Sequence, residues 1–400
     1  MEPPTEPRPR NTGLDAVRAG AALGVVMLHG AMAYSLSPFP GLAWTVQDHP
    51  SPVIDFVLWT VNSTVMPLFF LLSGFLSFSS LRQRGPREFL KQRTLRLLIP
   101  FVFGCVVILP IDLYAWLFCW ALQGRIPWFK LRTLKIRPPE GDYLWGVAHL
   151  WYVEYLYLYS VLLWLAALIW QRLNRPRIGD VTVRLFPLAG LAIQAIVMRH
   201  SPRILIGFSH AWFPQWPNVI YFGIWFLIGG CFSLRPPQWS QLRQIAQLLA
   251  AAVILTLVVP GLRAYSADVA VQGISHARLP DLFAIGYTLV AGLAAPAILS
   301  GGLGTASLGS SKMSEAIRRF AEASFWIYLI HHPIVGLLQY QFSRWPGGSG
   351  GKFLLCVIGT LLLSLASYRL FVRETWLGRL LNGQWLLKPR ELNRETPHTA

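Results

Sequence analysis

An arginine and a histidine stand inside an otherwise apolar N-terminal segment, "DAVRAGAALGVVMLHG", residues 15–30. Imidazole is the usual general base for a hydroxyl, although a lone histidine is often only a hydrogen-bonded core residue. Eleven residues at about 100° each turn a helix through roughly three full turns, so Arg18 and His29 are predicted to share one face, about 16 Å apart along the axis. For Arg18, the alternative is an interfacial anchor paired with Asp15.

Two adjacent histidines occur late in the chain, in "SFWIYLIHHPIVG", residues 324–336. His331 and His332 are predicted near mid-membrane, where ionisable groups are costly and are therefore functional candidates. Pro333 interrupts the local hydrogen-bond ladder. Because neighbouring helical residues point about 100° apart, at most one of the two histidines can share a face with His29.

Four further polar residues are weaker candidates. His149 and Glu154 begin the segment "HLWYVEYLYLYS", where an interfacial aromatic belt explains the Trp and Tyr but not Glu154. Asp55 and Asp112 are predicted near helix ends, where a structural role is favoured. No metal site is predicted, because the histidines have no carboxylate or thiolate at ligand spacing.

A basic cluster lies between the second and third apolar runs. Arg93 and Arg96 are spaced to face one direction on a helix and follow several other basic residues, Arg82, Arg84, Arg87 and Lys91. Arginine clusters bind phosphate groups. The alternative is that these charges only mark the cytoplasmic side of the membrane.

The composition predicts that these residues are held by membrane-spanning helices. The chain has 400 residues, of which 54% are hydrophobic and 13% charged, and its mean hydropathy is +0.45. Soluble domains carry about 25% charged residues. The net charge of +17 comes from basic residues that mostly flank apolar runs, which indicates a lipid bilayer rather than nucleic acid as the partner.

We predict an all-α, polytopic membrane protein of about ten spans with both termini cytoplasmic. One transmembrane domain, 14–373, lies between a cytoplasmic N-terminal segment, 1–13, and a C-terminal tail, 374–400. The first span is predicted to be retained rather than cleaved as a signal peptide. The predicted spans are 14–36, 53–80, 97–122, 143–170, 183–199, 218–234, 244–263, 281–301, 321–341 and 352–373.

One predicted outside loop, 124–142, departs from the positive-inside rule. It carries five basic residues, Arg125, Lys130, Arg132, Lys135 and Arg137. Either an anionic partner meets this loop, or the predicted topology is wrong there.

Taken together, these motifs resemble the acyltransferase-3 family of integral-membrane acyltransferases. The resemblance rests on Arg18 and His29, on "FFLLSGFLSF" at 69–78, on "KQRTLRLLIPF" at 91–101 and on "FWIYLIHHPI" at 325–334. The segments "LDAVRAGAALGVVMLHGAMAYS" and "AHLWYVEYLYLYS" are most similar to the glucan-modifying, succinyltransferase branch. Many members have an acidic residue in a D-L-F-F pattern where this chain has Pro67, which also fits that branch.

The resemblance implies an enzyme that moves an acyl group, acetyl or succinyl, from cytoplasmic acyl-CoA to a hydroxyl of an extracytoplasmic carbohydrate. It implies essential roles for Arg18 and His29 and donor contacts for Arg93 and Arg96. His331, His332, His149 and Glu154 are expected to assist His29 or the acceptor. The expected location is the inner membrane, and acyl-CoA is a co-substrate with no permanently bound cofactor.

A membrane transporter or exporter of an acylated or anionic small molecule is the alternative function. In a transporter, the same buried arginine and histidine would line a substrate path without making a bond. The absence of paired half-sequence symmetry disfavours it.

Overall fold

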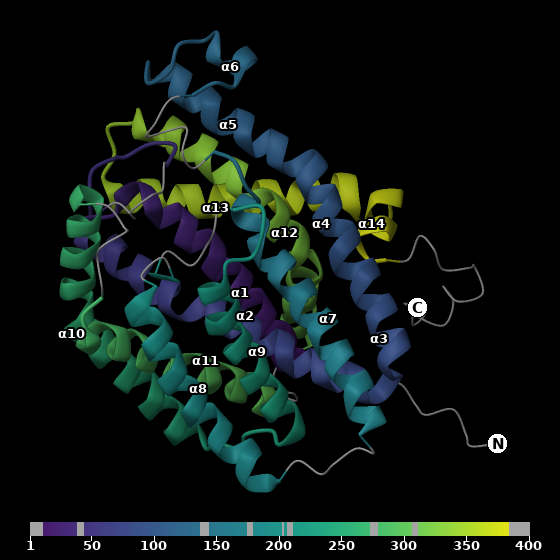
Figure 1. Cartoon of the computed structure of the whole chain (residues 1–400). Coiled ribbons are helices and arrows are strands. Elements are labelled where there is room, and N and C mark those ends of the chain that lie inside the picture. The colour runs from purple at the N-terminus through teal and green to yellow at the C-terminus, as the bar shows by residue number, and fades with distance from the viewer. Residues whose placement is uncertain are drawn as a thin grey trace.

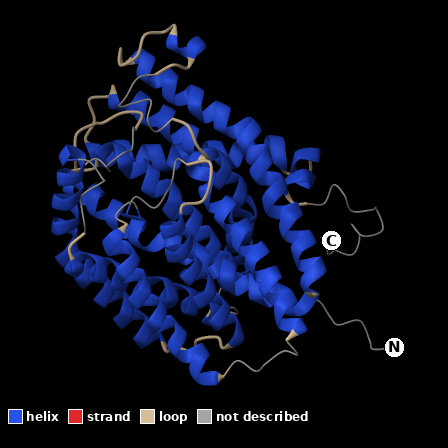
Figure 2. Ribbon diagram, in the orientation of Figure 1, coloured by secondary structure: helices blue, strands red, loops and turns tan. Residues whose placement is uncertain are grey.

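The computed structural model describes residues 11–37, 44–136, 144–173, 179–201, 204–205, 211–272, 279–305 and 311–383. Throughout these ranges the regular structure is helical and contains no strand (Figure 2). The prediction of an all-α polytopic membrane protein is therefore confirmed.

Nine helical segments in the described ranges are long and apolar enough to cross a membrane. They correspond to nine of the ten predicted spans. The remaining one, 321–341, lies within helix α12 (Ser311–Ser343), which has 33 residues. At 1.5 Å per residue this helix is about 50 Å long, so length does not exclude it. Its two histidines and Glu322 make it more polar than the other nine.

The other helices, in chain order, are α1 (Thr12–Ala31), α2 (Pro52–Arg84), α3 (Pro86–Arg93), α4 (Ile99–Phe103), α5 (Leu109–Leu122), α6 (Lys130–Thr133), α7 (Trp151–Arg172), α8 (Asp180–His200), α9 (Trp216–Leu234), α10 (Gln241–Gln272), α11 (Asp281–Gly304), α13 (Ser349–Ser367) and α14 (Trp376–Leu381). Figure 1 shows α8, α10 and α11 on one side of the bundle and α3, α4 and α5 on the opposite side.

Small residues allow the helices to approach closely, as expected where lipid provides no hydrophobic driving force between them. Helices α2 and α9 pack along each other. A Cβ atom on Gly74 would lie 1.9 Å from the Phe226 carbonyl oxygen, and one on Gly229 would lie 2.0 Å from the Leu71 carbonyl oxygen. Only glycine fits at these two crossing points, so their positions fix the α2–α9 pairing.

Helix α12 brings distant parts of the chain together. It packs against α1, α13 and α5. The histidine pair near the C-terminal end of the sequence is therefore placed beside the first helix and the third span.

The third span is one continuous rod with two π-helical turns. The turn η2 (Thr94–Leu98) joins α3 to α4, and the turn η3 (Gly104–Ile108) joins α4 to α5. A π turn bonds residue i to i+5 and is frequent at functional sites. Each turn rotates the residues that follow it relative to a regular α-helix.

A histidine-rich candidate active site

A cavity of about 330 Å³ collects three of the candidate histidines and one carboxylate, namely His29, His149, His332 and Asp112. The rest of its lining is mainly aromatic and aliphatic, including Trp44, Trp116, Trp120, Trp145, Trp151, Trp212, Tyr152 and Tyr328. An apolar pocket with a few convergent polar groups is the usual form of a small-molecule site.

The His29 ring is hydrogen-bonded to the ring of His331. His29 Nδ1 is 2.8 Å from His331 Nε2. The other nitrogen of His331, Nδ1, faces the carbonyl oxygens of Tyr328 at 2.8 Å and Ile327 at 3.1 Å. Carbonyl oxygens only accept, so His331 Nδ1 carries its proton; with neutral imidazoles, His331 Nε2 then accepts from His29 Nδ1. This network leaves the lone pair of His29 on Nε2.

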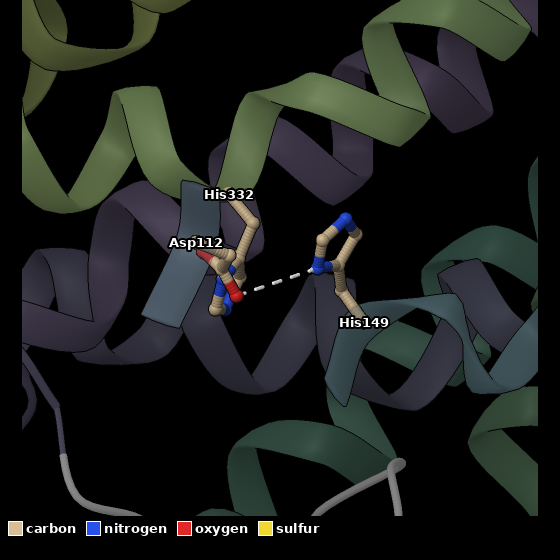
Figure 3. A group of neighbouring side chains, drawn as sticks. All are labelled: Asp112, His149 and His332. Atoms are coloured by element: carbon tan, nitrogen blue, oxygen red, sulfur yellow. Dashed lines mark hydrogen bonds and ion pairs between the residues drawn. The ribbon is translucent and has the colours of Figure 1, made fainter. Parts of the chain in front are cut away.

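His332 is held by a carboxylate. Its Nδ1 lies 2.8 Å and 3.0 Å from the two oxygens of Asp112, so Nδ1 donates to the carboxylate and Nε2 carries the lone pair. The ring is stacked on Trp116 at 4.4 Å and on His149 at 4.8 Å between centroids. Two such neighbours must occupy opposite faces, which fixes the ring plane. Figure 3 shows Asp112 and His332 side by side, with His149 next to them.

Pro333 explains the position of His149. Because proline has no backbone N–H, it leaves the carbonyl four residues earlier without its helical donor. That carbonyl belongs to Leu329, and His149 Nε2 lies 2.9 Å from its oxygen and donates to it. The Tyr328 hydroxyl in turn donates to the His149 carbonyl oxygen. The predicted break in the α12 ladder is therefore used to anchor His149, which lies just before α7.

Asp112, His149 and His332 also place three possible metal-ligand atoms within 4.8 Å of one another. The prediction of no metal site assumed that the histidines had no carboxylate companion, and Asp112 is such a companion. In the present arrangement, however, the His332 nitrogen that faces Asp112 carries a proton and cannot coordinate. The absence of a metal stays a prediction.

The end of helix α1 is anchored by Gln339, which is fully buried. Its Nε2 donates to the carbonyl oxygens of His29 at 3.0 Å and Gly30 at 2.8 Å in the last turn of α1. The His29 carbonyl also accepts from the backbone N–H of Met32. Trp44 Nε1 donates to Gln339 Oε1 at 2.6 Å, and the Trp44 ring stacks on the His29 ring. The His29 backbone and ring are therefore both fixed.

Arg18 faces α12, as His29 does. Its guanidinium pairs with Asp15 at 3.5 Å and donates to the Ala321 carbonyl oxygen at 3.3 Å. His29 contacts His331, ten residues further along α12. The prediction that the two residues share a face is confirmed, and so is the pairing of Arg18 with Asp15.

Tyr152 connects the arginines with the cavity. It lines the cavity, and its hydroxyl is 2.6 Å from Ser73 Oγ. The same hydroxyl lies within electrostatic range of the guanidiniums of Arg93 and Arg18. Arg93 belongs to α3 and Arg18 to α1, and neither is among the described residues that line the cavity.

Arg93 and Arg96 are not equivalent. Arg93 ends α3, is partly buried and lies over the Phe89 ring, whereas Arg96 is exposed. The π turn η2 begins between them. The three-residue step from Arg93 to Arg96 therefore covers a smaller angle around the axis than it would in a regular α-helix. The expectation that both side chains face one direction stays a prediction; the structure shows that they differ in burial.

The remaining acidic candidates lie apart from His29. Glu154 is not among the described residues that line the cavity, so the structure does not bring it to His29. Asp55 is buried and pairs with Arg263 of α10 at 2.6 Å, and it also accepts from the Leu36 amide. This ion pair joins two helices, in agreement with the structural role favoured for Asp55.

Two residues of the site, Trp44 and Gln339, were not singled out by sequence reasoning. Asp112 was only a weaker candidate, for which a structural role was favoured. Asp112 and Trp116 are four residues apart on one face of α5, and both contact His332. That spacing is visible in the sequence, but its partner lies 220 positions away.

The basic loop lies at the rim of the cavity. Leu134 and Leu144, on either side of its undescribed part, line the cavity. Arg132 and Lys135 are exposed, while Arg137 lies outside the described residues. Arg125 donates to the Trp44 carbonyl oxygen at 3.1 Å, so it is fixed close to the site.

The sequence model of the acyltransferase-3 family, described as an acyltransferase domain, matches residues 11–369. This match includes every residue placed in the cavity and in the arginine cluster. No curated protein and no solved structure shows a match to the chain.

Proposed function

This chain belongs to the acyltransferase-3 family and is a membrane O-acyltransferase, and we propose that it moves an acyl group from acyl-CoA to a carbohydrate hydroxyl. The donor is cytoplasmic, the acceptor is extracytoplasmic, and the membrane is the inner membrane. The acyl group is acetyl or succinyl, and the acceptor is a glucan or a cell-surface polysaccharide. No permanently bound cofactor takes part in this proposal.

The observation that carries the proposal is the state of His29. His331 accepts the Nδ1 proton of His29, which leaves Nε2 unprotonated beside the cavity. An unprotonated imidazole nitrogen can take a proton from a hydroxyl or attack a thioester carbon. Either use would explain why a histidine is buried at a cost within the membrane, which packing alone does not explain.

The donor side is supported by the arginines. CoA carries phosphates, which arginine binds through charge-assisted hydrogen bonds. Arg93 and Arg18 both lie within electrostatic range of Tyr152, which borders the same cavity as His29. The phosphates are therefore proposed to lie near the arginines, with the thioester end reaching past Tyr152 to His29.

The acceptor side is supported by the aromatic lining. Trp145 lies at the outer end of the predicted fourth span and Trp212 in a predicted outside loop, and both line the cavity. Broad aromatic faces pack against the apolar faces of sugar rings and leave their hydroxyls free for reaction. The nearby basic loop favours an acceptor that carries negative charge.

The overall reaction forms one bond and breaks one. The acceptor oxygen bonds to the acyl carbon, the carbon–sulfur bond of the thioester breaks, and the hydroxyl proton finally resides on the CoA thiol. The residues of the chain bind both substrates, exclude water and hold the proton between these events.

The test uses the full chain in lipid nanodiscs with radiolabelled acetyl-CoA or succinyl-CoA and a purified glucan. We expect sustained CoA release and a labelled glucan that both depend on the acceptor. His29→Ala should abolish both while acyl-CoA binding persists, and His200→Ala, at an exposed histidine at the end of α8, should leave both unchanged. Donor that stays intact with every acceptor, but crosses the membrane, would support a transporter instead.

A further inference from the structure

Two imidazoles with different supports share the cavity. His29 and His332 both line it, and their ring centroids are 5.0 Å apart. The Nδ1 atom of His29 is hydrogen-bonded to another histidine, His331. The Nδ1 atom of His332 is hydrogen-bonded to the carboxylate of Asp112. Each ring offers Nε2 to a bound substrate.

The two supports suit different tasks. A base that takes a proton becomes a cation, and a carboxylate about 3 Å from the ring stabilises that cation and holds the tautomer. Asp112 does this for His332. His29 has no carboxylate among its described contacts, but it has an imidazole that can accept its Nδ1 proton. When Nε2 of a histidine bonds to carbon, the ring must lose its Nδ1 proton to remain neutral.

We propose that the Asp112–His332 dyad removes the proton of the acceptor hydroxyl, while His29 Nε2 carries the acyl group between donor and acceptor. This inference rests on the proposed function and divides its chemistry between two residues. His332 and His29 are catalytic residues, and Asp112 and His331 are positioning residues.

The first half-reaction transfers the acyl group to His29. Nε2 bonds to the thioester carbon, the carbon–sulfur bond breaks, and its electron pair leaves on the CoA thiolate. The Nδ1 proton of His29 passes to His331 Nε2, at 2.8 Å. The product is a neutral acyl-imidazole, and the thiolate takes a proton from solvent when CoA leaves.

The second half-reaction transfers the acyl group to the acceptor. The hydroxyl oxygen bonds to the acyl carbon as its proton passes to His332 Nε2. The bond from carbon to His29 Nε2 breaks, its electron pair stays on Nε2, and His331 returns the proton to His29 Nδ1. His332 then releases its proton to solvent, which balances the proton taken up by CoA.

The surroundings of His332 keep it ready for this step. Trp116 and His149 stack on its two faces, and Asp112 fixes its Nδ1 edge. Because Nδ1 donates to Asp112, Nε2 is the ring nitrogen that remains to accept a proton from a bound hydroxyl. A base fixed in this way pays little orientation cost when the acceptor binds.

The experiment separates the two half-reactions in nanodiscs. Without acceptor, the natural chain should release about one CoA per protein in a burst and retain the labelled acyl group on the peptide that contains His29, detected by mass spectrometry. His332→Ala and Asp112→Asn should keep the burst and the adduct, but transfer to acceptor should slow at least about a hundredfold, the usual contribution of a general base. His29→Ala should show neither burst nor adduct.

Two controls separate the dyad from a merely structural role. Added imidazole should partly restore acceptor transfer in His332→Ala, because the vacated space lies in the cavity, and it should not restore transfer in His29→Ala. His200→Ala, remote from the cavity, should behave as the natural chain. A structural defect in His332→Ala would reduce the burst and the transfer together and would not respond to imidazole.

Several results would overturn the dyad. Steady turnover without any burst or adduct would mean direct transfer with a single base. Loss of the burst in both His332→Ala and Asp112→Asn would also contradict the division of tasks. A stoichiometric divalent metal that disappears in Asp112→Asn would make His332 a ligand instead. If no acyl-CoA loses its acyl group under any condition, the proposed function itself fails.

Discussion

Helix α1 separates two cavities of opposite character. On its α12 side, His29 borders the cavity of about 330 Å³ that holds three histidines and Asp112. On its other side, Ala16, Gly20 and Gly24 border a larger cavity of about 590 Å³, between α1, α2, α10 and α11. None of the described residues that line the larger cavity is titratable.

The difference teaches that volume does not locate chemistry in a membrane protein. A space lined by glycine, alanine and aliphatic side chains costs little in an apolar medium. A buried imidazole or carboxylate costs several kcal/mol unless it is paired. In the smaller cavity these groups are hydrogen-bonded in two pairs, His29 with His331 and His332 with Asp112. The following changes test that contrast, from the largest expected effect to the smallest.

His331→Ala is expected to lower kcat by about 10² to 10⁴, because His29 loses the group that fixes its tautomer. The Michaelis constant for acyl-CoA should stay within about twofold, since Arg93 and Arg18 are unchanged. His331→Gln, which can donate to the carbonyls and accept from His29, should recover part of the rate. A similar kcat in the alanine variant and the natural chain would show that His29 does not depend on His331.

Gln339→Ala is expected to lower both the rate and the thermal unfolding midpoint. It removes the side-chain partner of two buried groups, the Gly30 carbonyl and Trp44 Nε1, each costing about 1–3 kcal/mol. It also removes one of the two donors to the His29 carbonyl, so the end of α1 that carries His29 is held less firmly. We expect a loss of about tenfold in kcat. The matched control is Gln194→Ala, another buried glutamine, which donates to the Tyr221 carbonyl oxygen at 2.8 Å. That variant should lower the unfolding midpoint without lowering kcat.

Arg93→Ala is expected to raise the Michaelis constant for acyl-CoA by about tenfold, the equivalent of about 1.4 kcal/mol. Arg96→Ala should raise it less, because Arg96 is exposed whereas Arg93 is partly buried. Arg243→Ala, at an exposed arginine stacked on Trp239, controls for the loss of one positive charge. Equal values for all three variants would reduce Arg93 to a topology signal.

Neutralising the basic loop with Arg132→Gln and Lys135→Gln is expected to raise the Michaelis constant for an anionic glucan about twofold to threefold at low salt. Both side chains are exposed, so salt at about 1 M should remove the effect. A neutral glucan provides the comparison. No change with either acceptor would assign the loop no part in binding.

Gly20→Ala is expected to change nothing measurable in acyl transfer. A Cβ atom there would meet no atom within 4 Å, and the residue borders only the larger cavity among the two compared. The same kinetic assay serves as the measurement. A clear loss of rate would show that the apolar cavity takes part in the reaction and would end the contrast between the two sides of α1.

Local sequence patterns were enough to predict the helices and the face of α1 that carries Arg18 and His29. Apolar runs of membrane length are a property of each segment alone, because the backbone must satisfy its hydrogen bonds within the helix. The shared face of Arg18 and His29 follows from helical repeat alone. Pro333 was also readable as a break in the ladder, although the donor that fills that break was not.

The partners across helices were not readable. Asp112 was expected near a helix end, but it lies inside the continuous helical segment Pro86–Leu122. Only the packing of α12 against α5 makes it the support of His332. Gln339 looked like an ordinary polar residue, but it bonds to carbonyls about 310 positions away. The two π turns could not be predicted from the sequence either, and the first of them begins between Arg93 and Arg96.

The sequence by itself determined the membrane class and the family and indicated candidate residues for the chemistry, because hydropathy, helical repeat and residue type are local. The tertiary structure alone decided which nitrogen of each histidine is free and which group stands behind it. That choice depends on hydrogen bonds within about 3 Å between helices far apart in the chain. No pattern within one segment specifies such a contact.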